Sequence, residues 1–323
     1  MNRKYLLYSA LAILTLLLPL IIRDNYNLHL LIMSMIFIQL ASGLNLIVGY
    51  VGQLSLGHAA FFGIGAYTSA LLNLKLGIPF WEGMVLAGMM ASLIGFLLGY
   101  VTLRVRGHCF VLITIAFAEI FKLIHFNWVD LTHGQMGLSD IAPPAVKIPG
   151  LINFVFSTKA DYYYLALVLV ALTIYVNSRL VHSRFGRAFV GIRENEMLAE
   201  SVGINAFKYS MIAFVVGAFF AGIAGSTYAH YITFISPDLF SFGVTTTMIV
   251  MLVMGGKGTV VGPVAGAVIF TVLPEYLRIA EKLRLPIFGI ILLIGILYMP
   301  QGLVRVWENA LVQLRARKHV NVA

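Results

Sequence analysis

The sequence predicts an all-α integral membrane protein with about ten transmembrane helices, some of them short or broken. Hydrophobic residues make up 60% of the 323 residues and charged residues only 11%, whereas soluble domains average about 45–50% and about 25%. The apolar residues stand in continuous blocks, and their length is close to the roughly 20 residues that a helix needs to cross a bilayer. These blocks fill the chain, so we expect a single transmembrane domain over 1–323.

The first apolar block, 5–22, follows the basic residues Arg3 and Lys4 and resembles a signal peptide. No small-x-small cleavage site follows it, so we expect an uncleaved first span. The remaining spans are expected where further apolar blocks stand. The complete set is 5–22, 28–50, 57–74, 82–103, 108–126, 162–180, 208–232, 240–255, 259–277 and 285–300.

Glycines interrupt two of these helix pairs. The segment 49–57 breaks the apolar run 28–74, and the segment 255–263 breaks 240–277. Interrupted helices are tolerated in a membrane beside protein or a watery cavity, and in transporters such breaks often mark the pathway. A plain tight turn between helices is the alternative, and whether 240–277 spans fully or re-enters stays open.

The formal net charge of +9 does not indicate a nucleic-acid-binding surface, because the cations follow the expected membrane topology. With ten spans, the loops on the side of the N-terminus and the basic C-terminal tail hold most of the Lys and Arg residues. Since cytoplasmic loops carry an excess of Lys and Arg, we expect a multi-pass protein of the plasma (inner) membrane with both termini in the cytoplasm. The single cysteine, Cys109, excludes an internal disulfide.

Four stretches, in order along the chain, resemble one family. They are Gly43–Tyr67, Gly134–Leu138, Ser183–Glu196 and Gly255–Gly266. Together they are similar to the LivM-type permeases of branched-chain amino acid ABC importers; His133 departs from the pattern, because the family more often has glycine there. The resemblance implies the fold of an ABC importer permease and one half of a translocation path for leucine, isoleucine or valine, driven by separate ATPase subunits.

The resemblance also implies the partners of the chain. These are a homologous second permease subunit, two cytoplasmic ATPase subunits and an extracytoplasmic substrate-binding protein, which the outer loop 127–159 is a candidate to contact. The sequence contains no Gly-x4-Gly-Lys-Ser/Thr phosphate loop, so ATP would be bound by the partner subunits. We expect membrane lipid around the chain but no nucleic acid, no cofactor and no metal. No paired acids or nucleophile–base set indicates an enzyme.

Two other functions remain open at this stage. Relatives within the same family carry urea or short amides, and the residues do not exclude such a cargo. A stand-alone secondary transporter is the alternative outside the family. It would need a buried carboxylate or histidine relay, for which Glu119 and His58 are the candidates.

The polar segment 184–206 is the expected ATPase-coupling loop within the transmembrane domain. We expect a short helix that begins after Gly191 and ends at Gly203, because glycine commonly caps a helix C-terminus. Apolar contact with the ATPase is expected from Met197, Leu198 and Val202. The candidate coupling residues are Arg193, Glu194, Asn195, Glu196, Glu200 and Gly203. The alternative is a basic loop that merely follows the positive-inside rule.

Polar residues inside the apolar segments are candidates for lining the path, because they are costly when they face lipid. For the neutral residues the alternative is helix packing with satisfied hydrogen bonds, or, for threonine, a bond to its own helix. For Glu119 the alternative is an ion pair with Lys122, or a neutral, protonated side chain in a helix contact. The candidates are Asn45, Gln53, Ser55, His58, Glu119 and Thr246. Glycines such as Gly65 are expected to let helix backbones approach closely.

Overall fold

The computed structural model describes residues 15–20, 22, 24–105, 107–148, 152–278, 283–299, 302–304 and 306. Their regular structure is helical apart from one two-stranded sheet. In chain order the elements are α2 (Asn25–Asn45), η1 (Leu46–Val51), α3 (His58–Leu76), α4 (Phe80–Thr102), α5 (His108–Asn127), α6 (Val129–Thr132), η2 (Gly134–Met136), β1 (Ala145–Ile148), β2 (Ile152–Val155), α7 (Lys159–Val181), α8 (Arg184–Glu194), α9 (Glu196–Ser201), α10 (Ala206–Ile232), η3 (Pro237–Phe240), α11 (Phe242–Gly255), α12 (Gly262–Tyr276) and α13 (Arg284–Tyr298).

Five helical segments of the described residues are long and apolar enough to cross a membrane. They are Asn25–Val51, Phe80–Thr102, His108–Asn127, Lys159–Val181 and Ala206–Ile232. This supports an all-α integral membrane protein, while the number of ten spans stays a prediction. The expected span 5–22 lies largely outside the described residues.

The two helices expected over 240–277 are short. α11 has 14 residues and α12 has 15, so each reaches only about 21–23 Å at 1.5 Å per residue. The hydrocarbon core of a bilayer is about 30 Å thick. The glycine-rich break between them therefore separates two short helices, as the sequence predicts.

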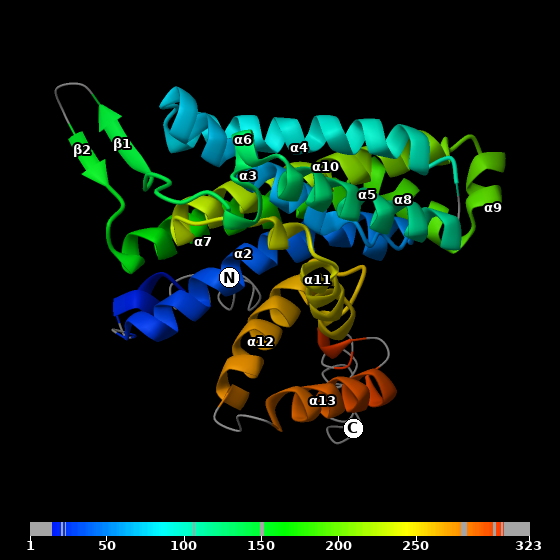
Figure 1. Cartoon of the computed structure of the whole chain (residues 1–323). Helices are drawn as coiled ribbons and strands as arrows, with labels where there is room; N and C mark the ends of the chain where they lie inside the picture. The colour runs from blue at the N-terminus through cyan, green and yellow to red at the C-terminus, as the bar shows by residue number, and fades with distance from the viewer. Residues whose placement is uncertain are drawn as a thin grey trace, which may run out of the picture.

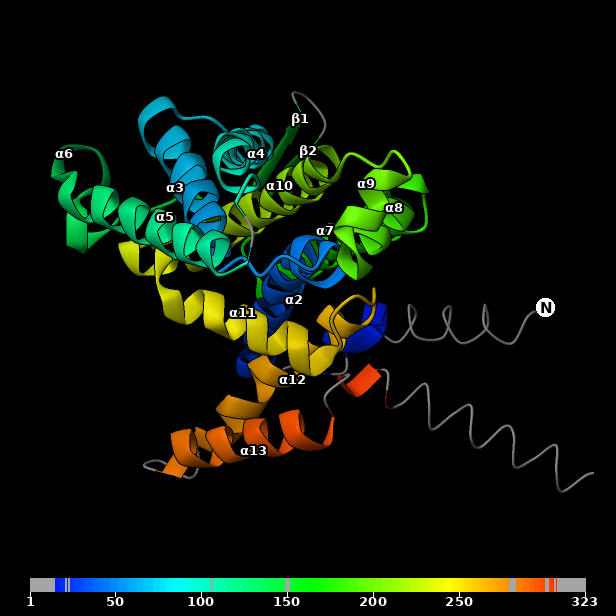
Figure 2. The ribbon, with the colours of Figure 1, turned by 90° about the vertical axis from the view of Figure 1, so that its right-hand side faces the viewer.

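The long helices lie side by side in a bundle whose two ends differ (Figure 1). The β1–β2 hairpin projects from one end, which we call the hairpin end, and α8 with α9 forms the other, the α8–α9 end. α10 lies in the centre and packs against α2, α3 and α4. Helices α11, α12 and α13 lie on the side of α2 that faces away from α4 (Figure 2).

Small residues bring α3, α4 and α10 into backbone contact. A Cβ on Gly65 would overlap the backbone of Gly222, and a Cβ on Gly222 would lie 2.7 Å from the carbonyl oxygen of Ala87. Such close approach of small residues is the usual way in which membrane helices associate. The expectation that Gly65 serves helix packing agrees with this geometry.

The segment between α5 and α7 contains a hairpin that the all-α prediction did not include. β1 and β2 pair antiparallel, with Ala145 opposite Val155 and Ile148 opposite Ile152. The indole Nε1 of Trp81 donates a hydrogen bond to the carbonyl oxygen of Ala145 at 3.1 Å, which ties the hairpin to the start of α4. This tertiary contact, rather than a strong strand pattern, holds four-residue strands in place.

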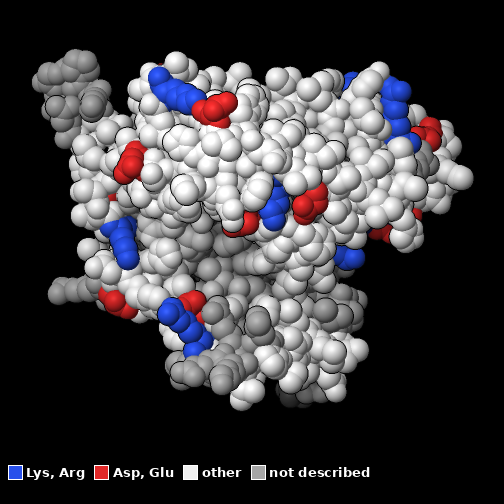
Figure 3. All heavy atoms as spheres, in the orientation of Figure 1, with Lys and Arg blue, Asp and Glu red and all other residues white. Residues whose placement is uncertain are grey.

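Charged side chains are sparse over the middle of the bundle. Figure 3 shows mostly uncharged surface over the long helices on the face that it presents, apart from a small group of basic and acidic side chains near its middle. Cations of the α8–α9 end stand near helix termini, in connecting loops and within α8; they are Arg104, Arg179, Arg184, Arg187, Arg193, Lys208 and Lys257. The hairpin end has fewer described cations, among them Lys75 and Lys159.

Candidate functional site

Three segments that are far apart in the sequence meet at the α8–α9 end. They are the C-terminal part of α2 with η1, the last turn of α8, and the loop 256–261 between α11 and α12. We call their contact region the three-segment junction and define it by Asn45, Gly49, Arg193, Gly258 and Thr259. It includes residues from both glycine-rich breaks and from the expected coupling loop.

The junction begins where α2 loses its regular hydrogen-bond pattern. η1 is a π-helix that ends at Gly52, whose φ of 87° is left-handed. The last carbonyl groups of a helix have no intrahelical donor, and one of them here, the carbonyl oxygen of Gly49, accepts a hydrogen bond from Arg193 Nη1 at 2.9 Å. A cation at a helix C-terminus also interacts favourably with the helix dipole.

Asn45 connects the same helix to the loop 256–261. Its Oδ1 accepts a hydrogen bond from the backbone N–H of Gly258 at 2.9 Å, and its Nδ2 donates to the carbonyl oxygen of Thr259 at 2.7 Å. A Cβ on Gly49 would overlap Asn45 Oδ1, and a Cβ on Gly258 would lie 3.0 Å from the carbonyl oxygen of Gly49. Glycine at 49 and 258 is therefore what allows the two backbones to approach.

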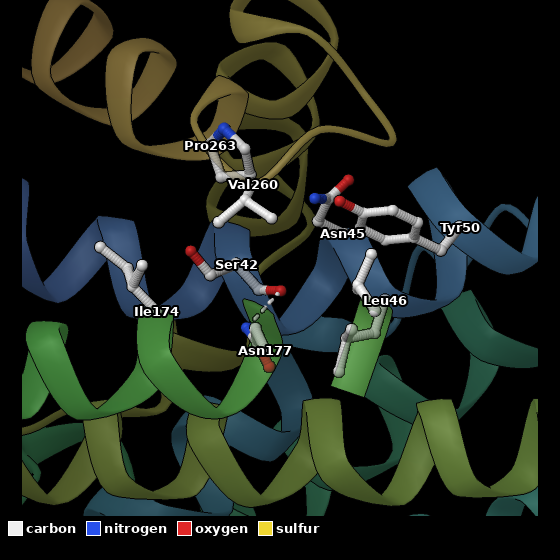
Figure 4. Close-up of a pocket in the computed structure, with 9 residues that line it drawn as sticks. Ser42, Asn45, Leu46, Tyr50, Ile174, Asn177, Val260 and Pro263 are labelled. Atoms are coloured by element: carbon white, nitrogen blue, oxygen red, sulfur yellow. Dashed lines mark hydrogen bonds between the residues drawn. The ribbon is translucent and has the colours of Figure 1, made fainter. Parts of the chain in front are cut away.

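A small cavity adjoins the junction between α2, α7 and the loop before α12 (Figure 4). Its volume is about 10 Å³, which is the space that one water molecule needs. Asn177 Nδ2 donates to the carbonyl oxygen of Ser42 at 3.2 Å, while Ser42 Oγ and Asn177 Oδ1 are buried without a hydrogen-bond partner among the described residues. The cavity has a polar wall but is too small for an amino acid. Its lining residues are Ser42, Asn45, Leu46, Tyr50, Ile174, Asn177, Val181, Val260 and Pro263.

The expected coupling loop folds as two helices rather than one. α8 begins at Arg184, seven residues before Gly191, because the Ser183 side chain accepts a hydrogen bond from the N–H of Phe185 at 3.1 Å and caps the helix. Asn195 is extended and ends α8, and its side chain accepts from the N–H of Leu198 at 3.1 Å to start α9.

The C-terminal end of α9 agrees with the sequence prediction. Gly203 has a φ of 87°; its N–H donates to Glu200 and the N–H of Ile204 donates to Ala199, both at 3.0 Å. These two bonds form a Schellman motif, in which glycine tolerates the left-handed conformation. The predicted glycine end of the helix agrees with this geometry, in which Val202 is the C-cap and Gly203 is the left-handed residue that follows it.

α9 presents apolar side chains outward at the end of the bundle. Met197, Leu198 and Val202 are 70%, 64% and 75% exposed. Glu194 is also exposed and pairs with Arg193, with 2.7 Å between Oε1 and Nη2. Exposed apolar side chains with charged neighbours are typical of a contact surface for another protein.

The other predicted path residues lie in different places. Ser55 and His58 are fully buried near the start of α3, and their side chains have no hydrogen-bond partner among the described residues. Gln53 is half-buried beside them in the chain. Thr246 is exposed and donates to the carbonyl oxygen of Phe242 at 2.9 Å, which is the bond to its own helix that the sequence left as an alternative.

Glu119 is half-buried on α5 and forms no hydrogen bond or ion pair with any described residue. Lys122 pairs instead with Asp238, with 4.0 Å between Nζ and Oδ1, so the Glu119–Lys122 pair that the sequence left as an alternative is not formed. The imidazole of His58 packs edge-on against Phe61 at 5.7 Å between ring centroids. A proton relay would require a chain of hydrogen bonds from His58 to Glu119. Within the described part of the protein, no such hydrogen bond links the two residues.

Sequence reasoning missed several buried polar residues. Ser69 Oγ lies 2.9 Å from His230 Nε2 and accepts from Ser226 Oγ at 2.8 Å, which joins α3 to α10. Asn177 bridges α7 to α2. Each is a polar residue within a predominantly apolar helix, and this is the signal that could have identified them.

Residues 26–297 match the family described as the permease component of branched-chain amino acid transport systems. The chain is 35% identical over 289 residues to the high-affinity branched-chain amino acid transport permease LivM of Salmonella typhimurium, covering 84% of this chain and 68% of the relative. It is 34% identical to LivM of Escherichia coli K12, with the same coverage. The high-affinity branched-chain amino acid transport system permease protein LivH of Salmonella typhimurium is 26% identical over 82% of this chain and 89% of its own length. No solved structure matches the chain. The chain therefore belongs to the permease family of branched-chain amino acid transport systems.

Proposed function

We propose that this chain is one of two membrane subunits of an ATP-driven importer and forms half of the path for branched-chain amino acids. The family match over 26–297 carries the proposal. The second subunit would be a homologous permease, because the relatives that match include both LivM and LivH. ATP would be hydrolysed by two separate ATPase subunits, and a soluble protein outside the cell would deliver the substrate.

The α8–α9 segment would be the docking site for an ATPase subunit. It stands at one end of the bundle, and its exposed residues Met197, Leu198 and Val202 form an apolar surface with Glu194 and Glu200 beside it. An interface typically has an apolar centre and a polar rim. The arrangement supports the coupling role proposed for the segment 184–206.

The α8–α9 end would face the cytoplasm, and both termini would lie on that side. The larger set of cations at this end supports the orientation, because cytoplasmic loops carry an excess of Lys and Arg. The hairpin end would then face outward, where β1 and β2 project from the bundle (Figure 1). The hairpin and the segments around it are the proposed contact for the binding protein.

Uptake of labelled leucine, with labelled urea in parallel, tests the proposed function. The measurement compares cells that lack this gene with cells in which it is restored. We expect leucine uptake to return with the gene and to stop on ATP depletion while the proton gradient is maintained. Return of urea uptake alone would change the cargo, and uptake that needs the gradient but not ATP would refute the ABC mechanism.

A further inference from the structure

Two side chains hold the three-segment junction together. Arg193 belongs to α8, the helix that leads into the exposed α9, and Asn45 belongs to α2. Arg193 bonds to the carbonyl oxygen of Gly49 at 2.9 Å, and Asn45 bonds to both Gly258 and Thr259. The α8–α9 segment is thus connected by directional bonds to the broken end of α2, and through it to the loop before α12.

The guanidinium group of Arg193 is held on several sides. Nε and Nη2 donate to Glu194 Oε1 at 3.2 and 2.7 Å, which leaves Nη1 for the carbonyl oxygen of Gly49. A Cβ on Gly258 would lie 2.8 Å from Nη1, and a Cβ on Gly52 would lie 2.7 Å from Cγ. The side chain of Arg193 therefore has little conformational freedom, although it is 28% exposed. It packs closely on two glycines, and its nitrogen atoms on both edges of the guanidinium group are hydrogen-bonded.

The position of Arg193 in the chain explains how its hydrogen bond could transmit movement from α9 to the bundle. Arg193 stands two residues before Asn195, where the backbone is extended between α8 and α9. Among the described residues, α8 also packs on the bundle through buried apolar side chains such as Phe189 and Ile192. Apolar contacts are non-directional and let a helix slide, whereas a charge-assisted hydrogen bond fixes its position.

We propose that Arg193 is a positioning residue that makes the α8–α9 segment, the η1 end of α2 and the loop 256–261 move as one body, with Asn45 as the second link. The proposal rests on the proposed function, because it takes α8–α9 as the segment that an ATPase moves. Displacement of α9 would then be transmitted to both glycine-rich breaks at once. A tilt of two short or broken helices at this end is the movement that would open or close a path beside them.

The first test measures coupling in the complete importer, reconstituted in liposomes with its partner permease, ATPases and binding protein. Arg193→Met keeps the length of the side chain but removes its charge and donors, and Arg193→Lys keeps the charge with one donor group. Arg179→Met is the matched control, because Arg179 is exposed at the same end of the bundle and contacts Tyr175. Labelled leucine uptake and ATP hydrolysis are measured in the same preparation.

We expect Arg193→Met to lower leucine uptake per ATP hydrolysed about tenfold, because loss of a charge-assisted bond frees the docking segment from the helices that it moves. Arg193→Lys should recover part of the ratio, and Arg179→Met should leave it unchanged. An unchanged ratio for Arg193→Met would overturn the inference while leaving the proposed function intact. Absence of leucine uptake by the unmodified importer would instead overturn the proposed function.

The second test measures the movement itself and does not depend on how the Arg193 variants fold. Spin labels at Ser201 and Lys257, both exposed, report the distance between α9 and the loop 256–261. In the otherwise unmodified importer we expect this distance to be the same with and without ATP, because the two segments move together. A distance that changes with ATP would show that they move independently and would overturn the inference. In the Asn45→Ala background, where the link to Gly258 and Thr259 is lost, we expect the change to appear.

Discussion

Replacement of Gly222 by alanine tests the close packing of α10 against α3 and α4. The added Cβ would lie 2.7 Å from Ala91 Cβ and 3.0 Å from Gly88 Cα, whereas carbon atoms pack best at about 3.5–4.0 Å. α4 and α10 would have to separate by roughly 0.5–1 Å, because the obstructing atoms are backbone atoms and a Cβ that cannot rotate away. α10 cannot shift toward α3 instead, because Gly65 of α3 already lies in backbone contact with Gly222.

The magnitude follows from two opposing effects. Overpacking of a filled interior costs about 1–3 kcal/mol, and alanine regains about 1 kcal/mol of helix propensity relative to glycine. Because the three nearest atoms would lie only 2.7–3.0 Å from the added Cβ, the overpacking cost falls in the upper half of this range, about 2–3 kcal/mol. We therefore expect Gly222→Ala to lower the free energy of unfolding by about 1–2 kcal/mol. At about 2–4 °C for each kcal/mol, the midpoint of thermal unfolding would fall by about 2–8 °C.

The assay is thermal unfolding of the purified protein in detergent at one fixed heating rate. Gly289→Ala is the matched control, since Gly289 lies within α13 and its added Cβ would meet no atom within 4 Å. The control should leave the midpoint unchanged or raise it. Equal midpoints for the two variants would refute the claim that backbone contact at Gly222 sets the distance between α4 and α10.

Three further changes test the site. Leu198→Glu should reduce co-purification of the ATPase about tenfold, because it places a charge in the apolar contact surface. Leu76→Glu is the control, since it makes the same change at an exposed residue of the hairpin end and should not reduce co-purification. Equal binding by both variants would contradict the docking assignment. Glu119→Gln should change ATP-driven leucine uptake by no more than about twofold and should not change its pH dependence, because no described bond joins this carboxylate to a proton relay. Loss of the pH dependence would support the secondary-transporter alternative. Asn195→Ala removes the N-cap of α9 and should destabilise that helix by about 0.5–2 kcal/mol, visible as faster amide hydrogen exchange over Glu196–Ser201; unchanged exchange would contradict the capping role.

Hydropathy predicts the helices of this fold well, because a segment that crosses lipid must be apolar along its whole length. The expected span 208–232 corresponds to α10 (Ala206–Ile232) and 108–126 to α5 (His108–Asn127). The π-helical end of α2 and the β1–β2 hairpin were not predicted. One extra residue in a helical turn leaves the hydropathy of a segment unchanged, and strands of four residues are held by contacts such as that of Trp81 rather than by their own pattern.

The sequence predicted which residues belong to the candidate site, but not which groups they bond to. Asn45 was identified because a polar side chain inside an apolar segment requires an explanation, and Arg193 because it lies in the basic loop. The partner of Arg193 is a backbone carbonyl 144 positions away in the sequence. Every residue carries such a carbonyl, so a side-chain pattern cannot indicate which one will be free to accept a bond. Free acceptors arise where a helix breaks, and that break follows from the fold.

The π-helix over Leu46–Val51 makes the length of this stretch as important as its composition. Removal of one residue would let the turn close as an ordinary α-helix and would rotate everything that follows by about 100° relative to α2. The carbonyl group of a residue other than Gly49 would then face α8, although Gly49, Arg193 and Asn45 were all still present. Outside Gly49, where a Cβ would overlap Asn45, substitutions are therefore the milder change in this stretch, whereas a one-residue insertion or deletion should remove the hydrogen bond to the docking segment.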